Sequence, residues 1–205
     1  MTVLVTGTGR CGTTWARDVL LASRVRATHQ AIRHEHVLGR IPFPALKDVE
    51  VSYEAAPMAD VPMWERVIVL VRHPFLVARS WVALNAFDDD GGFFDLHDSI
   101  RVHCPAVFDY EEPMLRALAF WVEWNLLALP HADFAAAVET LEPDVLVAEC
   151  GFQPRYQMEG SVAIRRDVNH LAEHKKPIPP ATAGDIPAAY KDRLADLAYQ
   201  FGYDL

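Results

Sequence analysis

The feature that most constrains this chain is a glycine-rich loop, Gly7-Thr8-Gly9-Arg10-Cys11-Gly12. It directly follows the apolar run Val3-Leu4-Val5, which predicts a strand buried on both faces, as in parallel sheets. From Thr13 to about Ser23, apolar residues recur at helical spacing and predict a helix. A strand, a glycine loop and a helix in this order open the nucleotide-binding α/β folds. The loop has the GxxxxG spacing of a P-loop, whose backbone N–H groups wrap a phosphate. The alternative is a glycine turn with a purely structural role.

Patterns further along the chain complete the prediction of the fold. Apolar or alternating runs predict strands at residues 25–28, 49–53, 67–71 and 144–148. Helical spacing predicts helices at residues 74–85, 113–129, 133–141 and 187–201. We therefore expect one α/β domain over residues 1–205, with a parallel sheet flanked by helices.

Two segments lack clear periodicity. Residues 87–113 contain the run Asp88-Asp89-Asp90-Gly91-Gly92 and predict a long loop. Such a loop either covers a site as a lid or is a plain surface insertion. Residues 151–180 are irregular and polar, and their cationic side chains either contact a ligand or are solvated charges: Arg165, Arg166, Lys175 and Lys176.

Composition excludes several classes of function. The formal net charge of −9 disfavours nucleic acids and anionic membranes as partners. The three cysteines, Cys11, Cys104 and Cys150, form no CxxC pair, which fits a reducing compartment better than a disulfide framework or a zinc site. No leader-like segment and no run of membrane-spanning length is apparent, so we expect a cytoplasmic protein, either monomeric or homodimeric.

The loop departs from the standard P-loop in an informative way. The lysine that should follow the second glycine is Thr13, and the basic residue lies inside the loop as Arg10. The apolar strands also carry no clear aspartate for holding a Mg²⁺-bound water. A donor that needs no metal therefore fits better than the ATP–Mg²⁺ of a kinase.

Two motifs resemble the sulfotransferases that use PAPS (3′-phosphoadenylyl sulfate). The run Gly9-Arg10-Cys11-Gly12-Thr13-Thr14-Trp15 is similar to their 5′-phosphosulfate loop, with Cys11 in place of the usual serine. Arg72, at the end of the run 67–71, and Ser80, eight residues later, are similar to the pair that binds the 3′-phosphate. The resemblance implies a P-loop NTPase-like sulfotransferase fold and a donor site made of Gly9, Arg10, Cys11, Gly12, Thr13, Thr14, Trp15, Arg72 and Ser80.

The resemblance also implies a reaction. PAPS would be the co-substrate, PAP the product, and a hydroxyl or amine of a small molecule or carbohydrate the acceptor, with no metal required. Arg10 would stabilise the transferring group, and Trp15 would either stack on the adenine or pack in the core. Two alternatives remain: a P-loop kinase or phosphotransferase for a small molecule, and a nucleotide-binding protein without chemistry, which Cys11 favours.

A general base should accept the proton of the acceptor. His29, after the second predicted strand, is our first candidate, because histidine titrates near neutrality. Glu54, after the third predicted strand, is the second, and Glu35, between His34 and His36, is the third. For each of them the alternative is a surface or structural role.

Overall fold

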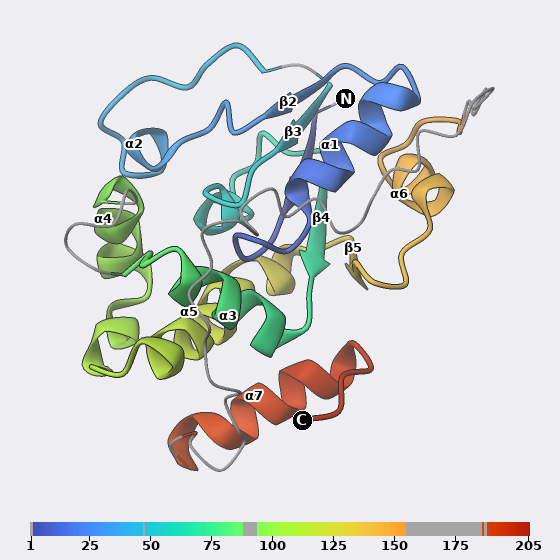
Figure 1. Ribbon diagram of the computed structural model, residues 1–205. Coiled ribbons are helices and arrows are strands. Elements are labelled where there is room, and N and C mark those ends of the chain that lie inside the picture. The colour runs from blue at the N-terminus through green and yellow to red at the C-terminus, as the bar shows by residue number, and fades with distance from the viewer. Residues whose placement is uncertain (1, 47, 88–93, 155–185, 187) are drawn as a thin grey trace.

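Five parallel strands form one sheet with helices on both faces (Figure 1). The computed structural model describes residues 2–46, 48–87, 94–154, 186 and 188–205. The α/β class and the parallel sheet predicted from the sequence are confirmed. The strands are β1 (Val3–Thr6), β2 (Ala27–His29), β3 (Val49–Val51), β4 (Arg66–Val71) and β5 (Phe134–Ala137), in the order β2-β3-β1-β4-β5.

The helices divide between the two faces of the sheet. Helices α1 (Thr13–Ala22) and α6 (Pro143–Glu149) share one hydrophobic core with that face of the strands. Helices α3 (Pro74–Ala83), α4 (Phe94–His103), α5 (Pro113–Ala128) and α7 (Ala188–Gln200) share the other core. Four short elements complete the fold: α2 (His34–Val37), η1 (Ala56–Met58), η2 (Pro105–Asp109) and η3 (Leu129–His131).

The two central strands are buried on both faces, as their continuous apolar sequences predict. Val3 and Val5 of β1 belong to the core beneath α1, whereas Leu4 belongs to the core beneath α5. Ile68 of β4 faces the α1 side and Val69 the α5 side in the same alternation. The runs Val3–Val5 and Val67–Val71 are therefore apolar at every position, because neither face of the sheet meets water there.

The order of the strands fixes where a ligand can enter. The chain leaves β1 through α1 toward β2, at one edge of the sheet, and leaves β4 through α3 to α5 toward β5, at the other edge. Neighbouring strands whose connections depart in opposite directions leave a crevice beyond their carboxyl ends, where ligands bind in open parallel sheets. The glycine loop follows β1 and Arg72 follows β4, so both lie at this crevice.

Two predicted elements are wrong: a predicted helix is a strand, and a predicted strand is a helix. Residues 133–141 were predicted as a helix, but Phe134–Ala137 is strand β5, because its pairing with β4 overrides the helical preference of alanine. Residues 144–148 were predicted as a strand but belong to α6, which has Pro143 in its first turn and Asp144 beside it. Val145 is 41% exposed, whereas Leu146 and Val147 are buried, so only one side of the apolar run is covered.

The loop predicted at residues 87–113 contains regular structure. Helix α4 and the 3₁₀ helix η2 occupy 94–103 and 105–109. Leu96 and Ile100 are four residues apart and both buried, a helical spacing too short to stand out from its polar surroundings. Arg40, after α2, and Asp98 of α4 form an ion pair at 2.9 Å.

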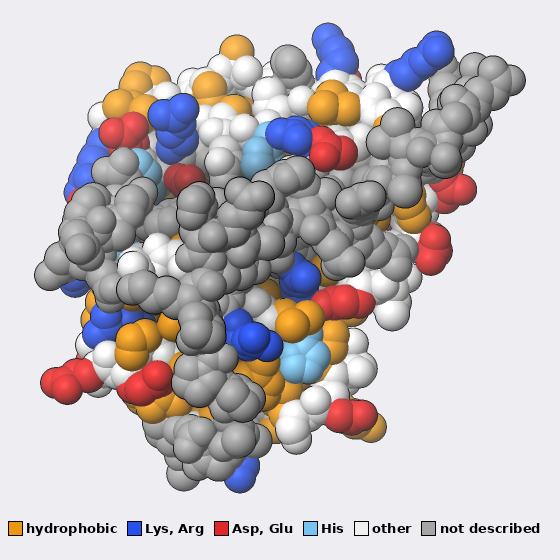
Figure 2. All heavy atoms as spheres, in the orientation of Figure 1, with side chains coloured by type: hydrophobic (Ala, Val, Ile, Leu, Met, Phe, Trp, Pro, Cys, Tyr) orange, Lys and Arg blue, Asp and Glu red, His pale blue; other side chains and the backbone are white. Residues whose placement is uncertain are grey.

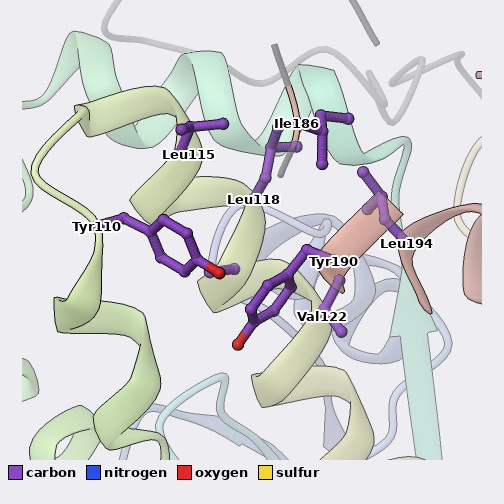
Figure 3. Close-up of a pocket in the computed structure, with 8 residues that line it drawn as sticks. Tyr110, Leu115, Leu118, Val122, Ile186, Tyr190 and Leu194 are labelled. Atoms are coloured by element: carbon purple, nitrogen blue, oxygen red, sulfur yellow. The ribbon is translucent and has the colours of Figure 1, made fainter. Parts of the chain in front are cut away.

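Helix α7, predicted at residues 187–201, is confirmed and packs on α5. Tyr110 meets Tyr190 edge-on, with 5.3 Å between ring centroids, beside an apolar pocket that Leu118 and Leu194 also line (Figure 3). Tyr190 and Arg193 of α7 both donate hydrogen bonds to Glu123 of α5, at 2.8 and 2.7 Å. These contacts fix the course of the chain toward Tyr203.

Candidate anion-binding site

The glycine loop adopts a conformation that its sequence requires. Arg10 and Gly12 have positive φ angles of 72° and 103°, and Gly12 is the N-cap of α1. Space excludes side chains at two of its glycines. A Cβ on Gly9 would lie 2.2 Å from Cζ2 of Trp81, and one on Gly12 would lie 2.7 Å from Cγ2 of Val138. The loop thus packs too closely for alanine at either position.

Three residues predicted to bind the donor converge at this loop. Nε of Arg10 donates a hydrogen bond to Oγ of Ser80 at 2.8 Å. Nη1 of Arg72 donates to the carbonyl oxygen of Arg10 at 3.3 Å. Ser80 and Arg72 are 70 and 62 residues from Arg10 in the sequence, so only the fold brings them together. We call Arg10, Arg72 and Ser80 the anion cluster.

The electrostatics of the anion cluster favour a negatively charged ligand. Burial lowers the pKa of Arg10 below its usual range, and the neighbouring charge of Arg72 lowers it further. Arginine nevertheless stays protonated at neutral pH, so the positive charges of Arg10 and Arg72 repel each other. Glu139 offsets this charge in part, with Oε1 at 3.8 Å from Nε of Arg72. An anion bound between the guanidinium groups would relieve their remaining repulsion.

The start of α1 supplies backbone donors beside the cluster. Among the described residues no side chain caps the Gly12 N-terminus, and the first turn of α1 contains no acidic residue. Thr13 is buried and Thr14 is half-buried at this helix end. A helix end of this kind presents N–H groups and a partial positive charge to an anion.

Two other loop residues face the core. Cys11 is fully buried, and burial raises the pKa of its thiol to about 12. Its sulfur packs near Gly7, in the core beneath α1. A ligand at the loop would therefore contact the backbone of Cys11 and not its side chain. Trp15 is 2% exposed in the same core, which fits the core-packing alternative proposed for it.

Three buried tryptophans hold the strand ends that carry the site. The indole N–H of Trp81 donates to the carbonyl oxygen of Gly9 at 3.0 Å. Trp121 donates to that of Arg72 at 2.9 Å, and Trp124 to that of Tyr53 at 2.8 Å. The loop after β1 and the ends of β4 and β3 are therefore each tied to α3 or α5. Nothing in the sequence pattern reveals which carbonyl oxygens accept hydrogen bonds from these indole groups.

Of the candidate bases, Glu54 has a neighbour, Tyr53, that contacts the glycine loop. It accepts a hydrogen bond from the backbone N–H of His34 at 2.6 Å, and its Oε2 lies 3.6 Å from Nδ1 of His34. Its neighbour Tyr53 has a pKa raised by burial and by Glu54 and lowered by Arg10, and its ring lies against Gly9. We call Tyr53, Glu54 and His34 the carboxylate cluster.

The other two candidates lie in different settings. His29 is at the end of β2, at the edge of the sheet, and burial and the charge of Arg17 lower its pKa. Its Nε2 is buried and makes no hydrogen bond within the described part of the chain. Glu35 is half-buried on α2, between the buried His34 and His36.

Sequence reasoning missed Glu50, a fully buried carboxylate on β3. Its oxygens accept hydrogen bonds from the hydroxyl of Thr28 and from the backbone N–H groups of Ala31 and Ile32, the latter two at 2.9 and 3.2 Å. Burial raises its pKa above the usual range. Glu50 thereby pins the segment that leads to His34. The sequence signal that could have identified Glu50 is its position as a single glutamate between the apolar residues of the run 49–51.

The remaining predictions about ligands rest on fewer observations. Arg165, Arg166, Lys175 and Lys176 lie outside the described residues. Over the ranges that are described, no three His, Cys, Asp or Glu side chains gather as a metal site would require. Likewise, none of the helices there is long and apolar enough to span a membrane. On the face in Figure 2, basic side chains are interspersed with acidic and hydrophobic ones.

Comparison of the chain with protein-family models, with curated proteins and with solved structures found no match.

Proposed function

We propose that this chain is a PAPS-dependent sulfotransferase. The observation that carries the proposal is the convergence of Arg10, Arg72 and Ser80 beside the glycine loop. Two arginines lie beyond the carboxyl ends of β1 and β4, whose connections leave in opposite directions. This place in a parallel sheet suits a ligand with more than one phosphate-like group. The sequence motifs that resemble sulfotransferases supply these same three residues.

The parts of the site fit the two ends of the donor. The loop N–H groups, Arg10, Thr13 and Thr14 would hold the 5′-phosphosulfate, and Arg72 with Ser80 would hold the 3′-phosphate. The close packing at Gly9 and Gly12 supports this assignment, because it shapes the loop as a cradle of backbone.

The reaction needs a nucleophile, a base and stabilisation of the leaving group. The acceptor oxygen or nitrogen forms a bond to sulfur while the bond from sulfur to the 5′-phosphate oxygen breaks, and that oxygen keeps the electron pair. Arg10 and the loop N–H groups would stabilise the developing charge. Glu54 would accept the acceptor proton, since Tyr53 links it to the loop and the N–H of His34 orients its carboxylate. We therefore place Glu54 ahead of His29 as the proposed base.

Ligand-dependent stability tests the proposal against the kinase alternative. We expect PAP to raise the melting temperature, with a gain in unfolding free energy of about 2.7 kcal/mol at 100 times its Kd. ATP with Mg²⁺ should give a smaller shift. Transfer of labelled sulfate from PAPS to a panel of hydroxyl and amine acceptors tests turnover. Stabilisation by ATP–Mg²⁺ alone, with phosphate transfer, would support the kinase instead. PAP binding without turnover on any acceptor would support the binding protein.

A further inference from the structure

Tyr203 lies far from Arg72 in sequence but contacts Val71 and His73, the two residues that flank it. Helix α7 ends in a Schellman motif. The N–H of Tyr203 donates a hydrogen bond to the carbonyl oxygen of Ala198 at 3.1 Å, and the N–H of Gly202 donates one to that of Tyr199 at 3.0 Å. Gly202 has the positive φ angle of 75° that this turn requires. The turn sends Tyr203 back to the carboxyl end of β4.

There the phenol meets the carboxylate beside the anion cluster. The hydroxyl of Tyr203 donates a hydrogen bond to Oε2 of Glu139 at 2.6 Å and lies 3.3 Å from the carbonyl oxygen of Val71. Its ring packs against His73, with 5.2 Å between ring centroids. The hydroxyl therefore approaches Glu139 from a fixed direction.

Glu139 is held at both of its oxygens. While Oε2 accepts from Tyr203, Oε1 accepts from the backbone N–H of His73 at 3.2 Å. Oε1 stays 3.8 Å from Nε of Arg72, beyond hydrogen-bonding distance. A carboxylate free to turn would form a direct, bidentate ion pair with this guanidinium, which is the preferred geometry of the two groups.

We propose that Tyr203 is a positioning residue that holds Glu139 back from Arg72, which keeps the Arg72 donors available to an anionic ligand. Glu139 then offsets the repulsion between Arg10 and Arg72 without occupying the place of the ligand. The inference rests on the proposed function only for the identity of that ligand, a 3′-phosphorylated nucleotide.

The test combines Tyr203→Phe, Glu139→Gln and the double variant. Tyr199→Phe is the matched control, because Tyr199 lies on the same helix and is 79% exposed. The first readout needs no ligand: the ¹H–¹⁵N signal of the Arg72 Nε–H group, assigned with Arg72→Lys. In Tyr203→Phe we expect this proton to move downfield and to exchange more slowly with water, since Glu139 can now reach it. In the double variant and in Tyr199→Phe this change should be absent.

The second readout is the affinity for PAP by calorimetry. Tyr203→Phe should weaken binding roughly 10-fold, the loss expected when one charged partner competes for Arg72. Glu139→Gln should bind at least as tightly as the wild type, and the double variant should regain that affinity. A double variant as weak as Tyr203→Phe, or an unchanged Arg72 signal in Tyr203→Phe, would overturn the inference. If the Arg72 signal changes as expected but PAP binds to no variant, the positioning role stands and the proposed function fails.

Discussion

The anion cluster and the carboxylate cluster both contact the glycine loop but are built in opposite ways. The anion cluster brings two arginines together, and Glu139 lies 3.8 Å from Nε of Arg72. The carboxylate cluster pairs Glu54 with His34 within itself. The first gathers positive charge, whereas the second pairs a carboxylate with a histidine. Donor binding and proton transfer should therefore be separable: changes at Arg72 or Ser80 should alter affinity, and changes in the carboxylate cluster should alter turnover.

The largest expected effect is on turnover in Glu54→Gln. Glutamine keeps an acceptor for the N–H of His34 but is a far weaker base, so kcat should fall by roughly 10²- to 10⁴-fold. Steady-state kinetics with PAPS and a reactive acceptor would measure it, and PAP affinity should stay as in the wild type. Glu111→Gln, at an exposed position before α5, is the control. A normal rate in Glu54→Gln together with a lost rate in His29→Ala would transfer the base role to His29.

Arg72→Ala should weaken PAP binding by roughly 100-fold, because a phosphate loses a charge-assisted, bidentate partner. Calorimetry at fixed ionic strength measures the change. Arg26→Ala is the matched control, since Arg26 pairs with Asp48 at the exposed edge of the sheet. Equal affinities for Arg72→Ala and the wild type would remove Arg72 from the site.

Two tryptophans one helical turn apart on α5 should affect different clusters. Trp121→Phe removes the donor to the Arg72 carbonyl and should weaken PAP binding by roughly 10-fold. Trp124→Phe removes the donor to the Tyr53 carbonyl and should lower kcat by a similar factor, about 10-fold. Kd and kcat are measured for both variants, and each variant serves as the control for the other. Identical profiles would show that the clusters are not separable.

The smallest effect concerns the pH dependence of stability at Glu50. Its pKa is raised in the folded state, so its contribution is fully present below its unfolded pKa and is lost as pH rises through the folded pKa. Glu50→Gln cannot ionise and should lack this loss. Urea unfolding of both proteins between pH 4 and pH 7 should therefore show the wild type weakening relative to the variant. Parallel curves would contradict the raised pKa.

Local patterns predicted the central part of the fold. The apolar runs of β1 and β4 are buried on both faces, so every position carries the signal, and the glycine loop follows directly from β1. Edge elements were harder. Strand β5 reads Phe134-Ala135-Ala136-Ala137, a sequence that also favours a helix, and only its pairing with β4 decides its type.

The candidate site likewise contains residues that local motifs predict and residues that only long-range packing brings in. Arg10, Arg72 and Ser80 were found because motif spacing carries them. Glu139 was missed because it follows β5, whose type was wrong, and Tyr203 was missed because its contact spans 64 residues. No local pattern encodes contacts of such range, which depend on how whole helices pack.

In the proposed site, the anion cluster recognises a second phosphate group, the 3′-phosphate of the donor. The most direct measurement is calorimetric titration of the wild type with PAP and with AMP, which lacks the 3′-phosphate. We expect PAP to bind roughly 100-fold more tightly than AMP, and Arg72→Ala to abolish most of this preference. Equal affinities of the wild type for PAP and AMP would contradict it.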